Sequence, residues 1–258
     1  MIRKDLHIHT NFCDGKDTPE EMVRAALDLN LETLGFSIHG NSFFDGSYVI
    51  TKEGMDTYKS EIYRLKEKYR DKIEILCGVE MDYHSDEVKA EDFDYSIGSV
   101  HYVKCGDTKL SIDASEESFK NAAETFFNGD YVAFANSYFK CVGDVINKTK
   151  ADIIGHFDLI SKFNEKNRLF NGDDERYVNA GFEAIDTLIK TGKPFEINTG
   201  AISRGYRTAP YPSDTFLRRI AELGGKVILS SDSHSASSLC CRFEEAERMA
   251  RDLGLEIV

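Results

Sequence analysis

Short apolar runs alternate with longer amphipathic segments along this chain. The apolar runs are rich in Val, Ile, Leu and Phe and end at polar residues, as buried parallel strands do. They predict strands over residues 5–10, 33–38, 73–79, 94–100, 151–155, 194–198 and 226–231. The intervening segments repeat apolar residues with helical spacing. They predict helices over residues 18–29, 54–69, 115–128, 131–150, 174–191, 213–223 and 239–253.

Two connections have sequences that predict their local structure. Thr18-Pro19-Glu20-Glu21 is a helix start, in which Thr18 caps, Pro19 occupies the first turn and Glu21 completes a capping box. The irregular polar stretch 102–115 suggests a small hairpin or a lid.

The alternation of strands and helices indicates about seven βα units with no Pro/Gly/Ser-rich linker between them. Such an alternation implies a parallel sheet. We expect a single domain over residues 1–258 with an α/β fold, namely a closed (β/α) barrel of the TIM type. An open doubly wound sheet is the alternative. The barrel is favoured because polar residues end nearly every strand, and the carboxyl ends of barrel strands share one mouth where active sites lie.

Composition narrows the classes of partner. The 258 residues are 41% hydrophobic and 30% charged, with a formal charge of −13. We therefore expect no nucleic-acid partner, which would need a basic face, whereas a small substrate with a cationic group is compatible. The absence of a secretory pattern or long apolar run predicts a cytoplasmic protein without a membrane partner. The six cysteines form no Cys-x-x-Cys pair, which predicts free thiols; the oligomeric state stays open.

Histidines and carboxylates gather at the predicted strand ends. His7 and His9 are two residues apart in the first strand, so their side chains point to the same face. Imidazole and carboxylate ligands suit zinc, iron or manganese, and the set is large enough for two or three divalent metals. The candidate ligands are His7, His9, Asp14, His39, Glu80, His101, His156, Asp232 and His234. Any one of these histidines could instead cap its strand, but six together favour a metal site; His84 is interpreted as a non-ligand.

Seven motifs carry a resemblance to a known superfamily, in its order along the chain. They are Asp5–Thr10 with Cys13-Asp14-Gly15, His39, Gly78–Tyr83, Gly98–His101, Gly155–Asp158, Glu196–Gly200 and Ser231–His234. The chain resembles the PHP-superfamily phosphoesterases (polymerase and histidinol phosphatase), most closely the monofunctional histidinol-phosphate phosphatase branch.

The resemblance implies a distorted (β/α)7 barrel with a trinuclear metal site. It implies one metal held by His7, His9, Glu80 and Asp232. It implies a second metal held by Glu80, His101 and His156, and a third held by Asp14, His39 and His234. The chain departs from many members at Ser37, where they carry Asp before the second motif's histidine. That departure leaves the surroundings of the third metal open.

The implied reaction is hydrolysis of a phosphate monoester by a metal-bridging hydroxide. No Ser or Cys stands in a Gly-rich elbow, so direct attack is expected rather than a covalent intermediate. The catalytic residues are then Glu80, His156 and Asp232. Either Asp232 or a water protonates the leaving group. Arg204 and Lys162 are expected to bind the phosphate, with solvated surface charge as the alternative.

The resemblance implies L-histidinol phosphate as substrate, in histidine biosynthesis. Alternatives are a PHP phosphoesterase acting on nucleotides or other small phosphate esters, and a catalytically silent metal-binding module. The candidates for binding the amine and imidazole of the substrate are residues that follow the motif histidines and Glu80. They are Phe43, Phe44, Asp45, Tyr48, Asp82, Tyr83, Tyr102 and Asp158.

Overall fold

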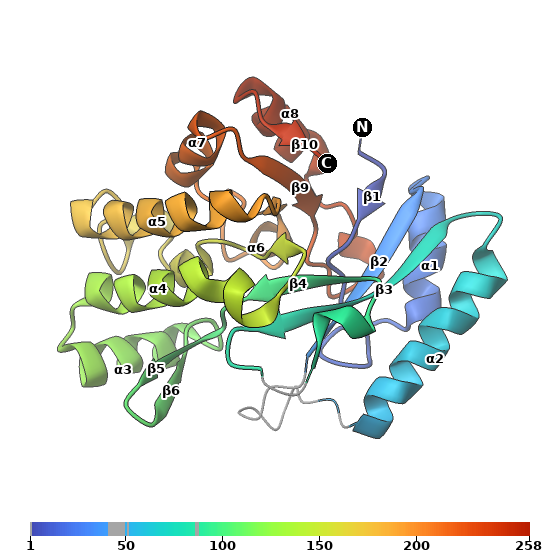
Figure 1. The fold of residues 1–258 in the computed structure, drawn as a ribbon, viewed down its shortest axis with the longest axis horizontal. Coiled ribbons are helices and arrows are strands. Elements are labelled where there is room, and N and C mark those ends of the chain that lie inside the picture. The colour runs from blue at the N-terminus through green and yellow to red at the C-terminus, as the bar shows by residue number, and fades with distance from the viewer. Residues whose placement is uncertain (1, 41–49, 51, 86–87) are drawn as a thin grey trace.

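Eight parallel strands form the central sheet of the computed structural model, which describes residues 2–40, 50, 52–85 and 88–258. The strand order is β1-β2-β3-β4-β7-β8-β9-β10 (Figure 1). The strands are β1 (Lys4–Asp5), β2 (Thr33–His39), β3 (Glu74–Asp82), β4 (Tyr95–Ser99), β7 (Ile153–Ile154), β8 (Phe195–Asn198), β9 (Lys226–Ser230) and β10 (Glu256–Ile257). The chain therefore follows the predicted parallel order, with one additional short strand at its end.

The sheet curls until the segments that follow β1 and β9 meet at the carboxyl ends of the strands. Ile8, just past β1, forms a parallel bridge with Ser233, which follows β9. His9 N donates to Ser233 O at 2.8 Å, and Ser233 N donates to His7 O at 3.1 Å. This contact brings the motifs at the two ends of the chain to the same mouth, and the expected distorted TIM-like barrel is confirmed.

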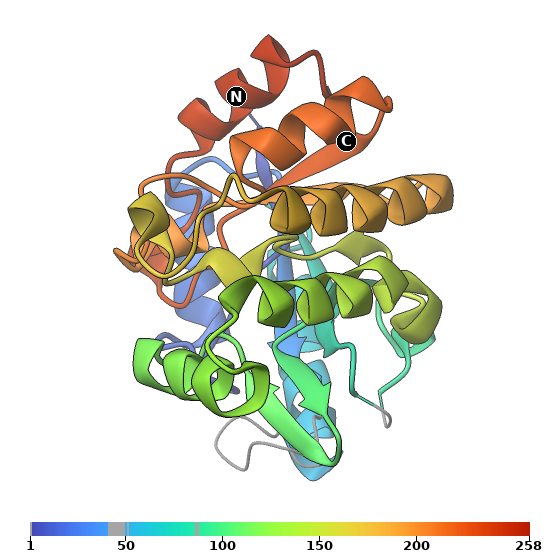
Figure 2. The same cartoon turned by 90° about the vertical axis from the view of Figure 1, so that its left-hand side faces the viewer.

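Helices cover the outside of the curled sheet. They are α1 (Pro19–Asp28), α2 (Lys52–Tyr69), α3 (Glu116–Phe127), α4 (Tyr131–Thr149), α5 (Glu175–Leu188), α6 (Gly200–Ser203), α7 (Asp214–Glu222) and α8 (Phe243–Asp252). Figure 2 shows α3, α4 and α5 stacked along one side, with α7 and α8 above them. One buried apolar cluster lies beneath these five helices, and a second lies beneath α1 and α2. Thr18 caps α1 through the predicted capping box.

Side chains explain where the first strand departs from its prediction. The regular part of β1 ends at Asp5 rather than continuing to Thr10, because Ile8 N donates to Ser37 Oγ at 2.9 Å instead of to a neighbouring strand carbonyl. Strand β3 is longer than predicted and contains Glu80 within it. In β2, Ser37 N donates in turn to Ile8 O at 3.0 Å. The Ser37 departure thus lies against the residue between His7 and His9.

Four other segments differ from their predictions or extend them. Helix α8 begins at Phe243 rather than at 239, because Cys240 and Arg242 have positive φ angles of 53° and 60° that interrupt a helix. The stretch 102–115 contains an antiparallel hairpin of β5 (Tyr102–Cys105) and β6 (Thr108–Ser111), so the hairpin interpretation is confirmed. Helix α6 and strand β10 were not predicted, since each is too short to show a period.

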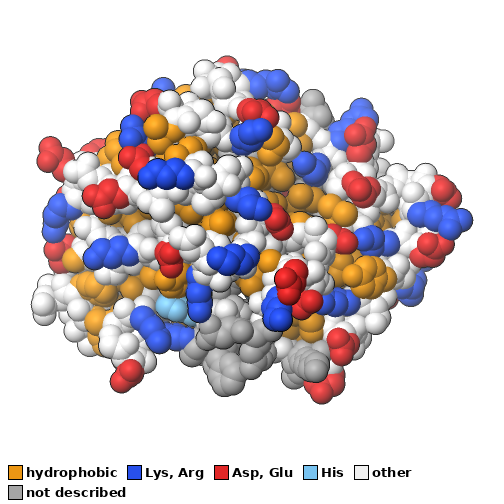
Figure 3. Space-filling model, viewed as in Figure 1, with side chains coloured by type: hydrophobic (Ala, Val, Ile, Leu, Met, Phe, Trp, Pro, Cys, Tyr) orange, Lys and Arg blue, Asp and Glu red, His pale blue; other side chains and the backbone are white. Residues whose placement is uncertain are grey.

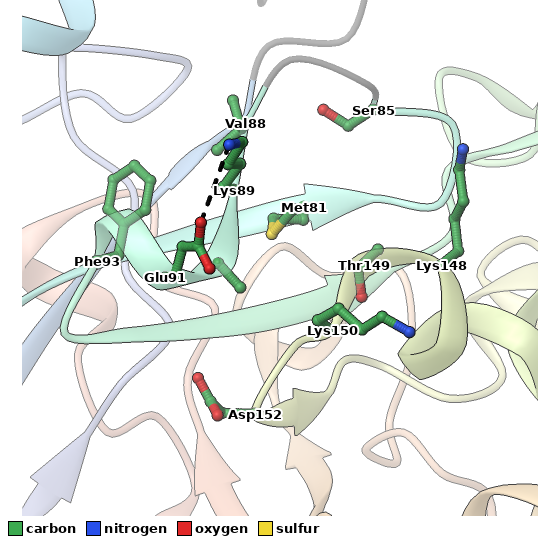
Figure 4. Close-up of a pocket in the computed structure, with 11 residues that line it drawn as sticks. Met81, Ser85, Val88, Lys89, Glu91, Phe93, Lys148, Thr149, Lys150 and Asp152 are labelled. Atoms are coloured by element: carbon green, nitrogen blue, oxygen red, sulfur yellow. Dashed lines mark ion pairs between the residues drawn. The ribbon is translucent and has the colours of Figure 1, made fainter.

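The connection from β3 to β4 lacks a full helix and leaves a groove on the outer face. Among the described residues it contains only the short helix η1 (Ala90–Asp92). The groove has a volume of about 550 Å³ and lies between this connection and the end of α4, with Lys148 and Lys150 at its edge (Figure 4). Its described lining residues include no histidine, so this groove is separate from the histidine-rich mouth.

The distribution of charge, the helices and the cysteines add three observations. On the face seen in Figure 3, positive and negative side chains are interspersed rather than gathered by sign. Among the residues that the structure describes, no helix has both the length and the apolar character needed to cross a bilayer. All six cysteines are free thiols, as predicted.

Candidate metal centre

The nine predicted ligands meet at the mouth of the barrel in three clusters. Within each cluster, one ligand atom per residue lies within 4.8 Å of the others. The clusters are His7, His9 and Asp232; Glu80, His101 and His156; and His9, Asp14, His39 and His234. His9 belongs to two of these clusters, whereas the sequence-based assignment gave it to one metal only. His84 is in none of these clusters of described residues.

Glu80 lies between the clusters and turns one oxygen toward each side. Its Oε1 is 2.9 Å from His156 Nε2 and 3.4 Å from His101 Nε2. Its Oε2 is 3.4 Å from His7 Nε2 and 3.0 Å from His39 Nδ1. A carboxylate with this arrangement can bridge two cations.

Strand register and one unusual backbone angle position these side chains. His39 and Glu80 are paired residues of neighbouring strands β2 and β3, so their side chains lie side by side. Asp232 has a φ of 47°, in the left-handed region that non-glycine residues seldom adopt. This turn lies just after β9, and Asp232 and His234 both face the mouth. Strained backbone of this kind is often found at functional sites.

Buried atoms without hydrogen-bond partners show that the clusters fit cations. His7 Nε2, Asp14 Oδ1 and Glu80 Oε2 are buried and have no hydrogen-bond partner among the described residues. Buried polar atoms are normally paired, so atoms left over at one point indicate a missing binding partner. Nitrogen and carboxylate oxygen donors together suit divalent transition metals, and the clusters can hold several.

Burial and neighbouring charges shift the pKa values of these groups. Burial opposes ionisation of Glu80, but His7, His101 and His39 hold its pKa well below the usual value. Burial and the neighbouring His234 and His39 lower the pKa of His9 to about 3. Burial also disfavours the charged form of His101, but Glu80 and Asp82 raise its pKa to about 10. The pKa of Glu80 therefore favours its anionic form and that of His9 its neutral form, the forms in which these groups bind metals, whereas His101 would release its proton when a metal binds.

The two predicted phosphate-binding cations line a cavity with a volume of about 260 Å³, together with members of each of the three clusters. Arg204, directly after α6, lies 3.0 Å from Asp232 Oδ2 through Nη2 and 2.8 Å from His234 Nδ1 through Nη1. Lys162 Nζ donates to Asp113 O at 2.8 Å. Both side chains are largely buried, with 27% and 11% of their surface exposed. This burial argues against the alternative of solvated surface charge.

Gly200 provides the room that Arg204 needs. A Cβ at this position would lie 2.9 Å from Arg204 Nη2 and 2.8 Å from Asp232 Cβ. Any larger residue would therefore displace the guanidinium or the ligand carboxylate.

Of the residues predicted to bind the amine and imidazole of the substrate, some line the cavity and others do not. Tyr102 and Asp82 line the cavity, and Asp82 also accepts from His101 N at 2.8 Å. Tyr83 instead donates to Asp144, and Asp158 is buried and accepts from Ser213 N. Neither Tyr83 nor Asp158 lines the cavity. Phe43, Phe44, Asp45 and Tyr48 lie outside the described residues.

Two carboxylates at the site were missed by sequence reasoning. Asp113 lines the cavity from the segment after β6. Glu196 is fully buried on β8, with Oε1 2.7 Å from His7 Nδ1. The sequence signal for Glu196 was its place in the Glu196–Gly200 motif, whereas Asp113 stands in an irregular stretch with no motif.

Comparison with known proteins identifies the family. A family model described as PHP domain matches residues 5–200. The chain belongs to the PHP domain family. A relative of this PHP domain, a probable histidinol-phosphatase from Schizosaccharomyces pombe, is 32% identical over 96% of this chain and 86% of its own.

Two solved structures share the fold of this PHP domain. One is a putative histidinol phosphatase from Listeria monocytogenes, with a TM-score of 0.82, 22% identity and coverage of 94% of this chain and 99% of its own. The other is a histidinol phosphate phosphatase from Lactococcus lactis, complexed with zinc, L-histidinol and phosphate. It has a TM-score of 0.73, 23% identity and coverage of 99% of this chain and 95% of its own.

Proposed function

We propose that this PHP domain hydrolyses L-histidinol phosphate to L-histidinol and phosphate, with residues 1–258 acting as one catalytic domain. The observation that carries the proposal is the lining of one cavity, which contains members of all three ligand clusters, two cationic side chains and the carboxylate of Asp113. The histidinol-phosphatase relatives support the choice of substrate. Histidine biosynthesis follows from this reaction, and a cytoplasmic location stays a prediction.

The metals are held by the clusters described above, with Glu80 shared between two of them. Divalent metals bound there supply Lewis acidity toward the phosphate and lower the pKa of water. His7, His9 and Asp232 hold one metal, and His101 and His156 hold a second. Asp14, His39 and His234 hold the third, with His9 close to both the first and the third.

Arg204 and Lys162 bind the outer oxygens of the phosphate. A guanidinium can donate two parallel hydrogen bonds to a phosphate, and an ammonium adds a further donor and positive charge. Arg204 lies beside Asp232 and His234, so a phosphate in contact with the clusters is within reach of its donors. Either Asp232, whose Oδ1 lies 3.4 Å from His9 Nε2, or a water would return a proton to the leaving alkoxide.

Asp113 is the candidate for binding the cationic amine of the substrate. Burial opposes its ionisation, but Lys162, His101 and His156 lower its pKa, so the side chain is a carboxylate at neutral pH. Its Oδ2 lies 3.4 Å from Lys162 Nζ, which is a loose contact. Asp113 can therefore accept a hydrogen bond from a substrate amine while Lys162 turns to the phosphate.

Replacing Asp113 by asparagine tests the proposal through the charge of the substrate. We expect kcat/KM for L-histidinol phosphate to fall by about 10- to 100-fold, since a charge-assisted hydrogen bond contributes about 1.5–3 kcal/mol. The value for p-nitrophenyl phosphate, which has no amine, should stay nearly unchanged. The matched control is Asp107→Asn, at the exposed turn of the β5–β6 hairpin that precedes Asp113.

The wild-type protein should also prefer L-histidinol phosphate over p-nitrophenyl phosphate and 5′-nucleotides. Equal kcat/KM for all three esters would contradict L-histidinol phosphate as the specific substrate. Only the broader interpretation as a phosphoesterase would then remain. A loss for both esters in Asp113→Asn would mean that Asp113 acts through Lys162 rather than on the amine.

A further inference from the structure

Strand β8 points two polar side chains into the barrel, yet neither belongs to a ligand cluster of the described residues. Glu196 and Asn198 are two residues apart, so they share the inner face of the strand. Both are fully buried. Buried polar groups at a metal site that are not ligands are often the groups that orient the ligands.

Both carboxylate oxygens of Glu196 are already used by ligand residues. Oε1 lies 2.7 Å from His7 Nδ1. Oε2 accepts from the backbone N–H of His156 at 2.9 Å and from Asn198 Nδ2 at 3.2 Å. Glu196 therefore connects a ligand of one cluster to the backbone of a ligand of another.

The contact to His7 decides which ring nitrogen faces the cluster. A hydrogen bond from Nδ1–H to the carboxylate leaves Nε2 with its lone pair free. Nε2 lies 3.4 Å from Glu80 Oε2 and 3.7 Å from Asp232 Oδ1, and it has no hydrogen-bond partner among the described residues. Asn198 completes the arrangement, because its Nδ2 lies 3.4 Å from Asp232 Oδ2.

We propose that Glu196 is a positioning residue that fixes the tautomer and orientation of His7 and thereby sets the metal affinity of the His7, His9 and Asp232 cluster. This role does not depend on the identity of the substrate. Strand β8 therefore has a different role from its neighbours. Strands β7 and β9 are followed by the ligands His156 and Asp232, whereas the side chains of β8 hydrogen-bond to these two residues.

The test measures metal affinity rather than activity. Glu196→Gln keeps the shape of the side chain, but one amide oxygen cannot accept from both His7 Nδ1–H and His156 N–H. We expect one bound zinc equivalent to weaken by about 10- to 100-fold in chelator competition. The remaining equivalents should keep their affinity. Cobalt(II) substitution should show a changed absorption spectrum for the weakened equivalent only.

A double-mutant cycle with His7→Gln shows whether Glu196 acts through His7. If it does, Glu196→Gln should cause no further loss of metal affinity in the His7→Gln protein, because coupled residues are not additive. Asp158→Asn is the matched control, since Asp158 is equally buried but accepts from Ser213 N rather than from a ligand. It should leave each zinc affinity in place even where it lowers the Tm of the metal-free protein.

Three outcomes would overturn the proposal: unchanged affinity in Glu196→Gln, equal weakening of every equivalent, or an additive loss in the double variant. If Glu196→Gln fails to fold, Glu196→Asp retains the charge but shortens the side chain. The same single weakened equivalent is expected there, and unchanged affinity would again contradict the role.

Discussion

Replacing Glu80 by glutamine should lower kcat for the phosphate ester by about 10³- to 10⁴-fold. The carboxylate faces His101 and His156 with one oxygen and His7 and His39 with the other. The amide of glutamine has only one oxygen and no charge, so it could ligate at most one of the two cations, and the other would lose a ligand. Metal catalysis contributes several kcal/mol, and a loss of about 4–6 kcal/mol corresponds to this change in rate. Steady-state kinetics and metal analysis of the same sample measure both effects.

Glu74→Gln is the control for the Glu80 variant. Glu74 lies at the start of the same strand, is exposed, and its side chain accepts from Thr33 Oγ1 at 2.9 Å, away from the clusters. It should retain full activity and metal content. If Glu80→Gln also keeps its kcat and its full complement of metal, the bridging role is wrong.

Arg204→Ala should lower kcat/KM by about 10- to 100-fold, mainly through a higher KM. Losing charge-assisted hydrogen bonds to the phosphate costs about 1.5–3 kcal/mol. Arg204→Lys should recover part of this loss, because lysine keeps the charge but not the planar pair of donors. Initial-rate measurements over a range of substrate concentrations separate KM from kcat.

The ion pair of Arg204 with Asp232 requires two controls. Metal analysis of Arg204→Ala should find the wild-type content, which shows that the loss does not come from Asp232. Arg218→Ala removes an exposed arginine of α7 that pairs with Asp214 and should leave the kinetics unchanged. Unchanged kinetics in Arg204→Ala itself would contradict a role of Arg204 in binding the phosphate.

The fold and the candidate ligands were accessible to sequence reasoning because each leaves a local signal. Strands and helices differ in period, and the carboxyl ends of parallel strands meet at one mouth. His39 and Glu80 were therefore predicted to meet although they are far apart in sequence, and the register of β2 and β3 places them side by side. The superfamily prediction was confirmed by the match of the PHP domain model.

Contacts that depend on tertiary structure left no such signal. Asp113 follows a hairpin in an irregular stretch, and only the folded chain shows that it faces Lys162. The early end of β1 arises because the Ser37 hydroxyl replaces a backbone acceptor for Ile8. The bridge between Ile8 and Ser233 joins the two ends of the chain, so no local pattern predicts it.

Phosphate release from L-histidinol phosphate, followed before and after removal of metal, tests the central claim most directly. The zinc-loaded protein should release phosphate, the chelated protein should not, and re-addition of zinc should restore the rate in step with the bound equivalents. Substantial phosphate release by metal-free protein would contradict a metal-dependent reaction. If the fully zinc-loaded protein releases no phosphate, the assignment of L-histidinol phosphate as substrate is wrong.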